Sequence, residues 1–228
     1  MAAKTFFITG TDTGVGKTVL TALLARHLRA QGVAVAALKP LCSGGREDAK
    51  ALHSALGGGL SLGEINPWYF RAPLAPLLAA RQEGKRIRMR DVLACLRRAR
   101  SRCEVLLIEG VGGLLSPLGE DFSNRELIAA LRAMPIVVCP NRLGAINQVL
   151  LVLAALPQTS ARHARVVLMS PPRANSVSRT NFEFLAQKLG TRRVFALPWL
   201  TRPLDVESAS MNARFRRTVD ALLKTSAL

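Results

Sequence analysis

The sequence predicts one doubly wound α/β domain, a mostly parallel sheet with helices on both faces. Short apolar runs alternate with amphipathic segments along the chain, and each run is apolar at nearly every position. Strands buried on both faces have this composition, and parallel strands need a long crossover between them, usually a helix. No repeat or low-complexity linker divides the 228 residues. We therefore expect a single domain over residues 1–228.

Six apolar runs predict the strands: Thr5–Thr9, Val33–Leu38, Val105–Ile108, Ile136–Cys139, Val166–Met169 and Val194–Leu197. The amphipathic stretches predict the helices: Lys17–Ala30, Arg90–Arg100, Arg125–Ala133, Ala145–Leu156, Ser178–Leu189 and Val206–Leu223. The segment Gly57–Pro76 is rich in Gly and Pro, and we interpret it as an excursion rather than a domain boundary. The second strand is expected beside the first in the sheet.

The composition excludes several classes of protein. Hydrophobic residues make up 49% of the chain, enough for a single large core, so a disordered or fibrous protein is excluded. The longest apolar run, Val149–Leu156, is too short to cross a bilayer, and Met1–Gly10 has no secretory signal. The four cysteines form no CxxC pair, which favours reduced thiols and a cytoplasmic protein; they are Cys42, Cys95, Cys103 and Cys139.

The charge balance is strongly basic, with 32 Lys and Arg against 15 Asp and Glu, a net charge of +17. Such a surface attracts nucleic acid, anionic lipid or anionic metabolites. The densest block, Arg81–Arg102, holds nine basic and two acidic residues. Its apolar residues form one helical face and most of its arginines lie off that face, which favours a solvated helix. It also lacks the interleaved aromatic residues that stack on bases.

The most specific motif follows the first strand. Gly10-Thr11-Asp12-Thr13-Gly14-Val15-Gly16-Lys17-Thr18 leads directly into the first helix. A glycine-rich turn lets backbone N–H groups surround a phosphate, and the helix dipole adds to the attraction. Lys17 would reach the β- and γ-phosphates, and the Thr18 hydroxyl would bind Mg²⁺. The strict P-loop pattern GxxxxGK[ST] fails at one place, because Thr11 stands where its first glycine would be.

Two further strand ends carry charged side chains. Lys39 follows the second strand, with Glu47 and Asp48 shortly after it, and Glu109 ends the third strand before Gly110-Val111-Gly112-Gly113. Ligands in this fold class bind at the carboxyl ends of strands, so a lysine and two carboxylates could converge there on a metal-bound triphosphate. Taken alone, a lysine at a strand end such as Lys39 is more often a surface residue, and Asp48 could be a helix cap. Glu109 favours a site role, because small residues follow it directly.

Five ordered blocks resemble the dethiobiotin synthetase family: GTDTGVGKT, KPLCSG, IEGVGGLLSPL, LGAIN and LPWL. The intervening NPWYFRAPLAPLLAARQEGKRI also fits that family, so the resemblance runs from about Phe7 to Leu200. It implies a P-loop NTPase fold and an ATP-dependent ligase. The implied reaction joins 7,8-diaminononanoate and CO₂ (or bicarbonate) into dethiobiotin, through a carbamate and a carbamic-phosphoric anhydride, and releases ADP and phosphate. Mg²⁺ is the implied cofactor and ATP the co-substrate.

The resemblance also implies residue roles. Lys17 and Lys39 match the catalytic positions. Thr18, Asp48 and Glu109 match the metal positions. The substrate positions are Ser43 and the helix start Gly144, Ala145, Ile146 and Asn147, which in this family contributes across a homodimer interface. The nucleotide positions are Thr13, Gly14, Val15, Gly16, Lys17, Thr18, Val19, Asp48, Glu109, Gly110, Val111, Gly112, Pro198, Trp199, Leu200 and Asp205.

Two features of the sequence do not fit the family resemblance, and two other classes of protein remain possible. Met169-Ser170 stands where the family commonly has an Asn-Asp pair against the base, which puts the preference for adenine in doubt. The family resemblance does not explain the +17 charge. Another P-loop ligase is one alternative, although the amidotransferase extension of the cobalamin amidoligases is not visible. A ParA- or MinD-like switch is the other, but Asp12 stands where its additional loop lysine would be. We therefore expect neither a specific nucleic-acid partner nor a membrane partner.

Overall fold

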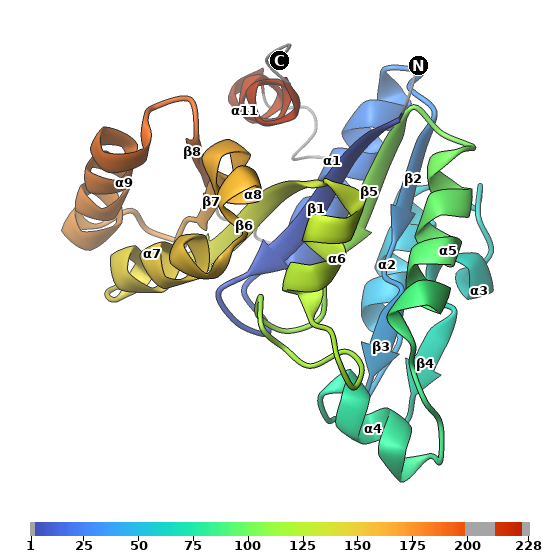
Figure 1. Ribbon diagram of the computed structural model, residues 1–228. Coiled ribbons are helices and arrows are strands. Elements are labelled where there is room, and N and C mark those ends of the chain that lie inside the picture. Colours follow the sequence, from blue (N-terminus) through green and yellow to red (C-terminus); the bar gives the residue numbers. More distant parts are fainter. Residues whose placement is uncertain (1–2, 199–212, 225–228) are drawn as a thin grey trace.

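The computed structural model describes residues 3–198 and 213–224 and contains a six-stranded parallel sheet (Figure 1). The strand order is β2-β5-β1-β6-β7-β8. The strands are β1 (Lys4–Gly10), β2 (Val35–Leu38), β5 (Val105–Glu109), β6 (Met134–Pro140), β7 (Arg165–Met169) and β8 (Val194–Leu197). All six predicted strands are confirmed, and the parallel sheet confirms the predicted fold class.

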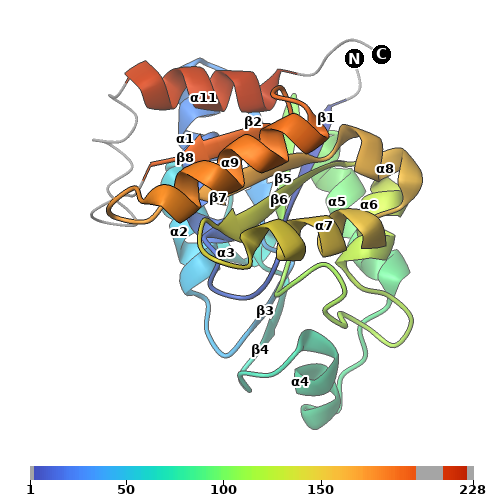
Figure 2. The same ribbon diagram turned by 90° about the vertical axis from the view of Figure 1, so that its left-hand side faces the viewer.

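Helices cover both faces of the sheet, as Figures 1 and 2 show. One face carries α1 (Lys17–Ala30), α2 (Glu47–Ala55) and α11 (Ala213–Leu223). The other carries α5 (Met89–Arg100), α6 (Asn124–Leu131), α7 (Ala145–Ala155), α8 (Gln158–His163) and α9 (Ser176–Leu189). Neighbouring residues of β1 separate to the two faces, because Phe6 belongs to the first core and Phe7 to the second.

The expected pairing of the first two strands is wrong. β5 lies between β2 and β1, and it pairs Ile108 with Leu38 and Glu109 with Ile8. The crossover through α1 passes over one strand position, which the later strand β5 fills. This order places the carboxyl ends of β2, β5 and β1 side by side, so residues that follow these three strands can form one site.

The Gly- and Pro-rich segment is an excursion, as predicted, but it is more ordered than expected. A second, two-stranded parallel sheet joins β3 (Leu41–Ser43) to β4 (Trp68–Phe70). The short helices α3 (Leu62–Ile65) and α4 (Pro76–Gln82) flank it. Figure 1 shows β3, β4 and α4 beyond the carboxyl ends of the main strands. The excursion therefore stands beside the edge at which a ligand would bind.

The arginine-rich helix α5 has the amphipathic form that the sequence predicts. Val92, Leu93 and Leu96 are buried against the sheet, whereas Arg97 and Arg98 are exposed. The four cysteines are free thiols. Across residues 3–198 and 213–224, every helix is too short or too polar to span a bilayer.

Candidate active site

The phosphate-loop motif lies where the sequence places it, between β1 and α1. Gly16 is the N-cap of α1 with φ of 100°, a backbone conformation that favours glycine. A Cβ atom at Gly10 would stand 2.6 Å from Cγ2 of Val15, so this position also needs glycine. Lys17 is 5% exposed and donates to the backbone carbonyl of Asp12 at 2.7 Å. The lysine is thus folded back over its own loop.

A second lysine bridges two carboxylates beside this loop. Nζ of Lys39, just after β2, lies 2.7 Å from Oδ2 of Asp48 and 2.7 Å from Oε1 of Glu109. It also donates to the carbonyl of Gly110 at 3.3 Å. The Thr18 hydroxyl donates to the same Glu109 oxygen at 2.7 Å. The structure therefore brings together the residues predicted from three strand ends.

The charges in this cluster shift one another's pKa values. Burial lowers the pKa of Lys17 to about 8, and the nearby Lys39 ammonium adds to this effect. Burial would also lower the pKa of Lys39, but Glu109 and Asp48 outweigh it and raise that pKa above its usual value. Burial opposes ionisation of Asp48, yet the charge and hydrogen bond of Lys39 lower its pKa. Lys39 and Asp48 are therefore charged at neutral pH.

The oxygen groups of the cluster fit a magnesium ion. Mg²⁺ prefers hard oxygen ligands and usually takes one or two carboxylates, with water and phosphate completing its shell. Glu109 is fully buried, and its Oε2 has no hydrogen-bond partner among the described residues. Residues 3–198 and 213–224 contain no group of three or more His, Cys, Asp or Glu suited to a metal. Any magnesium here would therefore depend on Thr18, Asp48 and Glu109 together with phosphate.

Two asparagines hold the loops of the cluster, and our sequence analysis missed both. Asn124, the first residue of α6, donates to the carbonyls of Val111 and Gly113, each at 2.8 Å. Asn66 donates to the carbonyls of Lys39 at 2.9 Å and Pro40 at 3.3 Å. Both side chains are fully buried. Asn124 was detectable as part of the Ser123–Glu126 capping box, and Asn66 within the NPWYF block.

The predicted substrate residues lie at the same edge of the sheet but outside the lysine–carboxylate cluster. Ser43 ends β3 and donates to the carbonyl of Leu74 at 2.6 Å. Gly144, with φ of 91°, is the N-cap of α7 after β6, and Asn147 is exposed. No hydrogen bond among the described residues joins either element to the cluster. Their roles remain expectations.

Of the residues predicted to lie near the nucleotide base, some are described by the structure and others are not. Met169 ends β7 and packs against the phosphate loop, because a Cβ at Gly16 would stand 3.0 Å from its methyl carbon. The Ser170 N–H donates to the carbonyl of Leu197. Pro198 is exposed directly after β8. Trp199, Leu200 and Asp205 lie outside the described residues.

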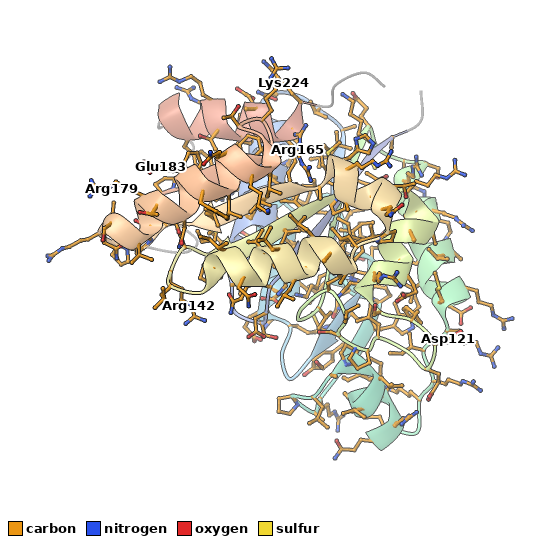
Figure 3. All side chains as sticks on the ribbon, turned by 60° about the vertical axis from the view of Figure 1, so that its left-hand side comes forward. Asp121, Arg142, Arg165, Arg179, Glu183 and Lys224 are labelled. Atoms are coloured by element: carbon orange, nitrogen blue, oxygen red, sulfur yellow. The ribbon has the colours of Figure 1, made fainter. Side chains whose placement is uncertain are left out.

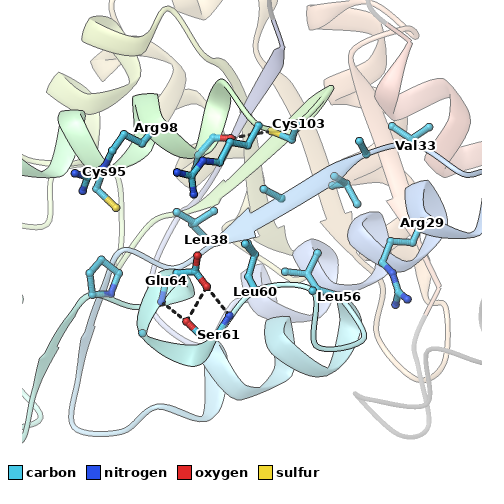
Figure 4. Close-up of a pocket in the computed structure, with 18 residues that line it drawn as sticks. Arg29, Val33, Leu38, Leu56, Leu60, Ser61, Glu64, Cys95, Arg98 and Cys103 are labelled. Carbon is cyan, nitrogen blue, oxygen red and sulfur yellow. Dashed lines mark hydrogen bonds between the residues drawn. The ribbon is translucent and has the colours of Figure 1, made fainter.

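Two hollows lie away from the lysine–carboxylate cluster. One, of about 810 Å³, follows the outer edge of β2 beside α5 (Figure 4). The other, of about 1300 Å³, lies at the amino ends of the strands. Neither is lined by Lys17, Lys39 or Glu109. The charged cluster, rather than a deep cavity, marks the candidate active site.

Known proteins resemble the chain over most of its length. A family model described as an AAA domain matches residues 4–204. The ATP-dependent dethiobiotin synthetase BioD of Anaeromyxobacter dehalogenans is 36% identical over 85% of this chain and 89% of its own. The same enzyme of Xanthomonas oryzae pv. oryzae is 32% identical over 92% of this chain and 96% of its own.

Solved structures with the same fold are more distant. The pNOB8 ParA protein bound to nonspecific DNA has a TM-score of 0.57 at 14% identity, covering 97% of each chain. The MinD cell division protein of Aquifex aeolicus has a TM-score of 0.55 at 17% identity, covering 99% of each chain. At these identities the likeness shows the fold alone.

Proposed function

The chain belongs to the dethiobiotin synthetase family, and on that premise we propose that it carboxylates 7,8-diaminononanoate and closes its ureido ring with ATP. The reaction consumes CO₂ and ATP and yields dethiobiotin, ADP and phosphate. The observation that carries this proposal is the cluster of Lys17, Lys39, Thr18, Asp48 and Glu109 at three adjacent strand ends. It combines a phosphate loop with a second buried ammonium group.

The chemistry explains why two lysines are needed. One substrate amine captures CO₂ as a carbamate, and a carbamate oxygen attacks the γ-phosphorus as the bond to ADP breaks. The second amine then attacks the carbamoyl carbon, phosphate leaves, and the ring closes. The first transfer joins two anions, so it costs several kcal/mol unless positive charge lies between them. We assign Lys17 to the phosphates and Lys39 to the carbamate side of the transfer.

Mg²⁺ is part of the proposal, with Thr18, Asp48 and Glu109 as its protein-side ligands. The ion would neutralise phosphate charge when it is bound. The buried unpartnered oxygen of Glu109 supports this assignment. Lys39 and the Thr18 hydroxyl both donate to Oε1 of Glu109, which leaves Oε2 open to the ion. Nucleotide binding also involves the backbone from Thr13 to Val19 and from Glu109 to Gly112 in this proposal.

We assign the substrate to Ser43 and to the start of α7. A carboxylate suits the N-terminal end of a helix, because free N–H groups point outward there. Leu143 is 86% exposed and Leu151 is 62% exposed, which supports packing of α7 against a second copy of the chain. In a homodimer, Gly144–Asn147 would then face the substrate of the partner. Pro198, Trp199, Leu200 and Asp205 complete the nucleotide side of the proposal.

One assay tests the proposed reaction. ADP release and dethiobiotin formation are measured with ATP, Mg²⁺, diaminononanoate and bicarbonate, and then with each component omitted. We expect both products only in the complete mixture, in equal amounts. ADP release that does not depend on diaminononanoate but increases with DNA would instead support a nucleotide switch. Size-exclusion chromatography with light scattering tests the homodimer separately.

A further inference from the structure

The larger hollow, of about 1300 Å³, lies at the opposite end of the sheet from the candidate active site. Lys4 of β1, Met134 of β6 and Arg165 of β7 line it, and each stands at the first residue of its strand. Residues of α8 and α11 close its sides. Strands of five to seven residues separate it from the phosphate loop by about 20 Å at roughly 3.3 Å per residue. A ligand bound in this hollow would therefore not contact the candidate active site.

Among the described residues, the charged side chains that line this hollow are all basic. Seven of its residues are Lys or Arg, another is His163, and none is Asp or Glu. The hollow beside β2 in Figure 4 differs, because Arg29, Arg98 and Arg102 share it with Glu64 and with apolar side chains. Seven of the 32 Lys and Arg residues thus gather at the amino ends of the strands, with no balancing carboxylate among the described lining residues.

Arg165 forms a fixed wall of the hollow. Its side chain is 8% exposed, and it donates to the carbonyl of Ala221 at 3.2 Å and to the carbonyls of Leu222 and Lys224. These carbonyls lie at the end of α11, where a helix leaves its acceptors unpaired. Figure 3 shows Arg165 close beneath α11, near Lys224. Burial lowers the pKa of Arg165, yet a guanidinium keeps its charge at neutral pH.

Arg193 forms a second fixed wall in the same way. It donates to the carbonyl of Ala164 at 3.0 Å and to that of Ala161 at 2.5 Å, which end α8. Two helices therefore direct their C-terminal ends at the hollow, and each end holds a half-buried or buried arginine. The partial negative charge of a helix C-terminus, about half an elementary charge, offsets only part of each guanidinium charge, so each arginine still contributes net positive charge to the hollow.

The remaining cations at the rim are available to a ligand. Arg132, Arg162 and Arg192 are exposed, and none forms an ion pair with a described carboxylate. The one acidic residue at this end of α11 is Asp220, which lies outside the lining and accepts hydrogen bonds from His27 at 2.7 Å and Gln31 at 3.2 Å. The Asp220 carboxylate is therefore bound to residues at the end of α1 and does not face the hollow.

We propose that this hollow binds a compact polyanion that carries several phosphate groups. Arginine binds phosphate oxygens through two parallel N–H groups, and three arginines of the lining, Arg132, Arg162 and Arg192, are exposed. Among the described lining residues Phe195 is the one Phe, Tyr or Trp, and it is packed in the core at 8% exposure, which leaves the imidazole of His163 as the single exposed ring. The hollow, of about 1300 Å³, is somewhat larger than the roughly 300–1,000 Å³ of common small-molecule sites, so it has room for a compact ligand with its water shell. Because the exposed cations outnumber the single exposed ring, phosphates rather than a nucleobase are the main feature that this site recognises.

Inorganic tripolyphosphate is the probe for the first test. Arginines are modified with p-hydroxyphenylglyoxal at physiological salt, with and without the probe, and the modified sites are mapped by mass spectrometry. We expect the probe to protect Arg162 and Arg192 but not Arg97 on α5. This readout is independent of phosphate-loop binding, because that loop contains no arginine. Equal modification of Arg162 and Arg192 with and without the probe would overturn the proposal.

Calorimetry on two matched double variants is the second test. Arg162→Gln with Arg192→Gln removes two charges from the hollow, and Arg97→Gln with Arg98→Gln removes two from exposed positions of α5. We expect tripolyphosphate affinity to fall by about tenfold or more in the first variant and to stay within about twofold in the second. Equal losses would mean diffuse attraction to the surface and would refute a site. Binding of a 20-nucleotide single strand that depends on Arg162 and Arg192, without tripolyphosphate binding, would assign the hollow to nucleic acid instead.

Discussion

Replacing Lys39 with glutamine tests the centre of the proposed mechanism. The change removes the ammonium group that lies 2.7 Å from both Asp48 and Glu109 and keeps a side chain of similar length. Glu109 would then be a fully buried carboxylate whose hydrogen bond from the Thr18 hydroxyl remains, while Oε2 stays unpartnered. The variant therefore changes folding stability and catalysis for one reason, the loss of a buried cation.

Both effects have an expected size. Breaking a buried ion pair by removing one partner costs about 3–5 kcal/mol of stability. The glutamine amide still donates one hydrogen bond, so we expect the lower end of that range. Loss of one electrostatic stabiliser lowers turnover by about 10²-fold, equivalent to about 2.7 kcal/mol of transition-state stabilisation. Nucleotide binding should persist, because Lys17 and Thr18 remain.

The assay measures unfolding by denaturant, nucleotide affinity and dethiobiotin formation on one preparation. Lys50→Gln is the matched control, since Lys50 is 64% exposed and lies 3.7 Å from Glu47, a surface pair of little energetic effect. Lys39→Arg should recover only part of the turnover, because a planar guanidinium does not replace a compact ammonium between two oxyanions. Equal losses of affinity and turnover in Lys39→Gln would refute the catalytic assignment, and so would normal turnover.

Three further predictions concern the phosphate loop and the surface. Lys17→Ala should lower turnover more than stability, and near-normal turnover would remove Lys17 from the mechanism. Thr18→Val should raise the Mg²⁺ concentration needed for half-maximal activity, and an unchanged requirement would contradict its role as a ligand. The Arg81–Arg102 block should bind DNA only at low salt and without response to ATP, as measured by fluorescence anisotropy. Nucleotide-dependent DNA binding at physiological salt would favour the switch.

Folding stability should also depend on pH through Lys17. Its pKa is about 8 in the folded protein against 10.5 in an unfolded chain, so the unfolded state binds more protons between these values. Stability contributed by this site therefore rises as pH increases from 8 to 10.5, by up to about 3 kcal/mol at 1.36 kcal/mol per pKa unit. Denaturant unfolding of wild type and Lys17→Met across this range measures the difference. A stability difference that is constant with pH would contradict the lowered pKa.

Most of the main sheet could be predicted from the sequence, because its strands are continuous apolar runs and its helices are amphipathic. The helix Lys17–Ala30 has the predicted bounds, and the helix expected from Val206 is described from Ala213 to Leu223. Strand order was not predictable in the same way, since the pattern along the chain does not show which crossover leaves a gap for β5. The short elements β3, β4 and α3 were missed because runs of three or four residues carry no clear period.

The charged residues of the site were predictable because each lies at the end of a strand or within ten residues after it, and parallel strand ends meet at one edge. What the sequence did not show is that Lys39 pairs with both carboxylates, which depends on β5 lying between β2 and β1. The buried asparagines were missed for a different reason. Asn66 and Asn124 act on backbone carbonyls of their neighbours, and an asparagine in a loop carries no pattern that distinguishes this role from an ordinary turn.

The balance of positive and negative side chains differs between the two ends of the sheet. At the carboxyl ends, Lys17 and Lys39 are balanced by Asp48 and Glu109, so the free site gains little from the net charge of +17. At the amino ends, seven lysines and arginines line a hollow that has no carboxylate among its described residues. A catalytic role for the excess charge would require the opposite arrangement, with unbalanced cations next to the phosphate loop. The seven cations of the amino-end hollow therefore fit a binding role rather than catalysis, and Arg162→Gln with Arg192→Gln should weaken polyanion binding without changing dethiobiotin formation.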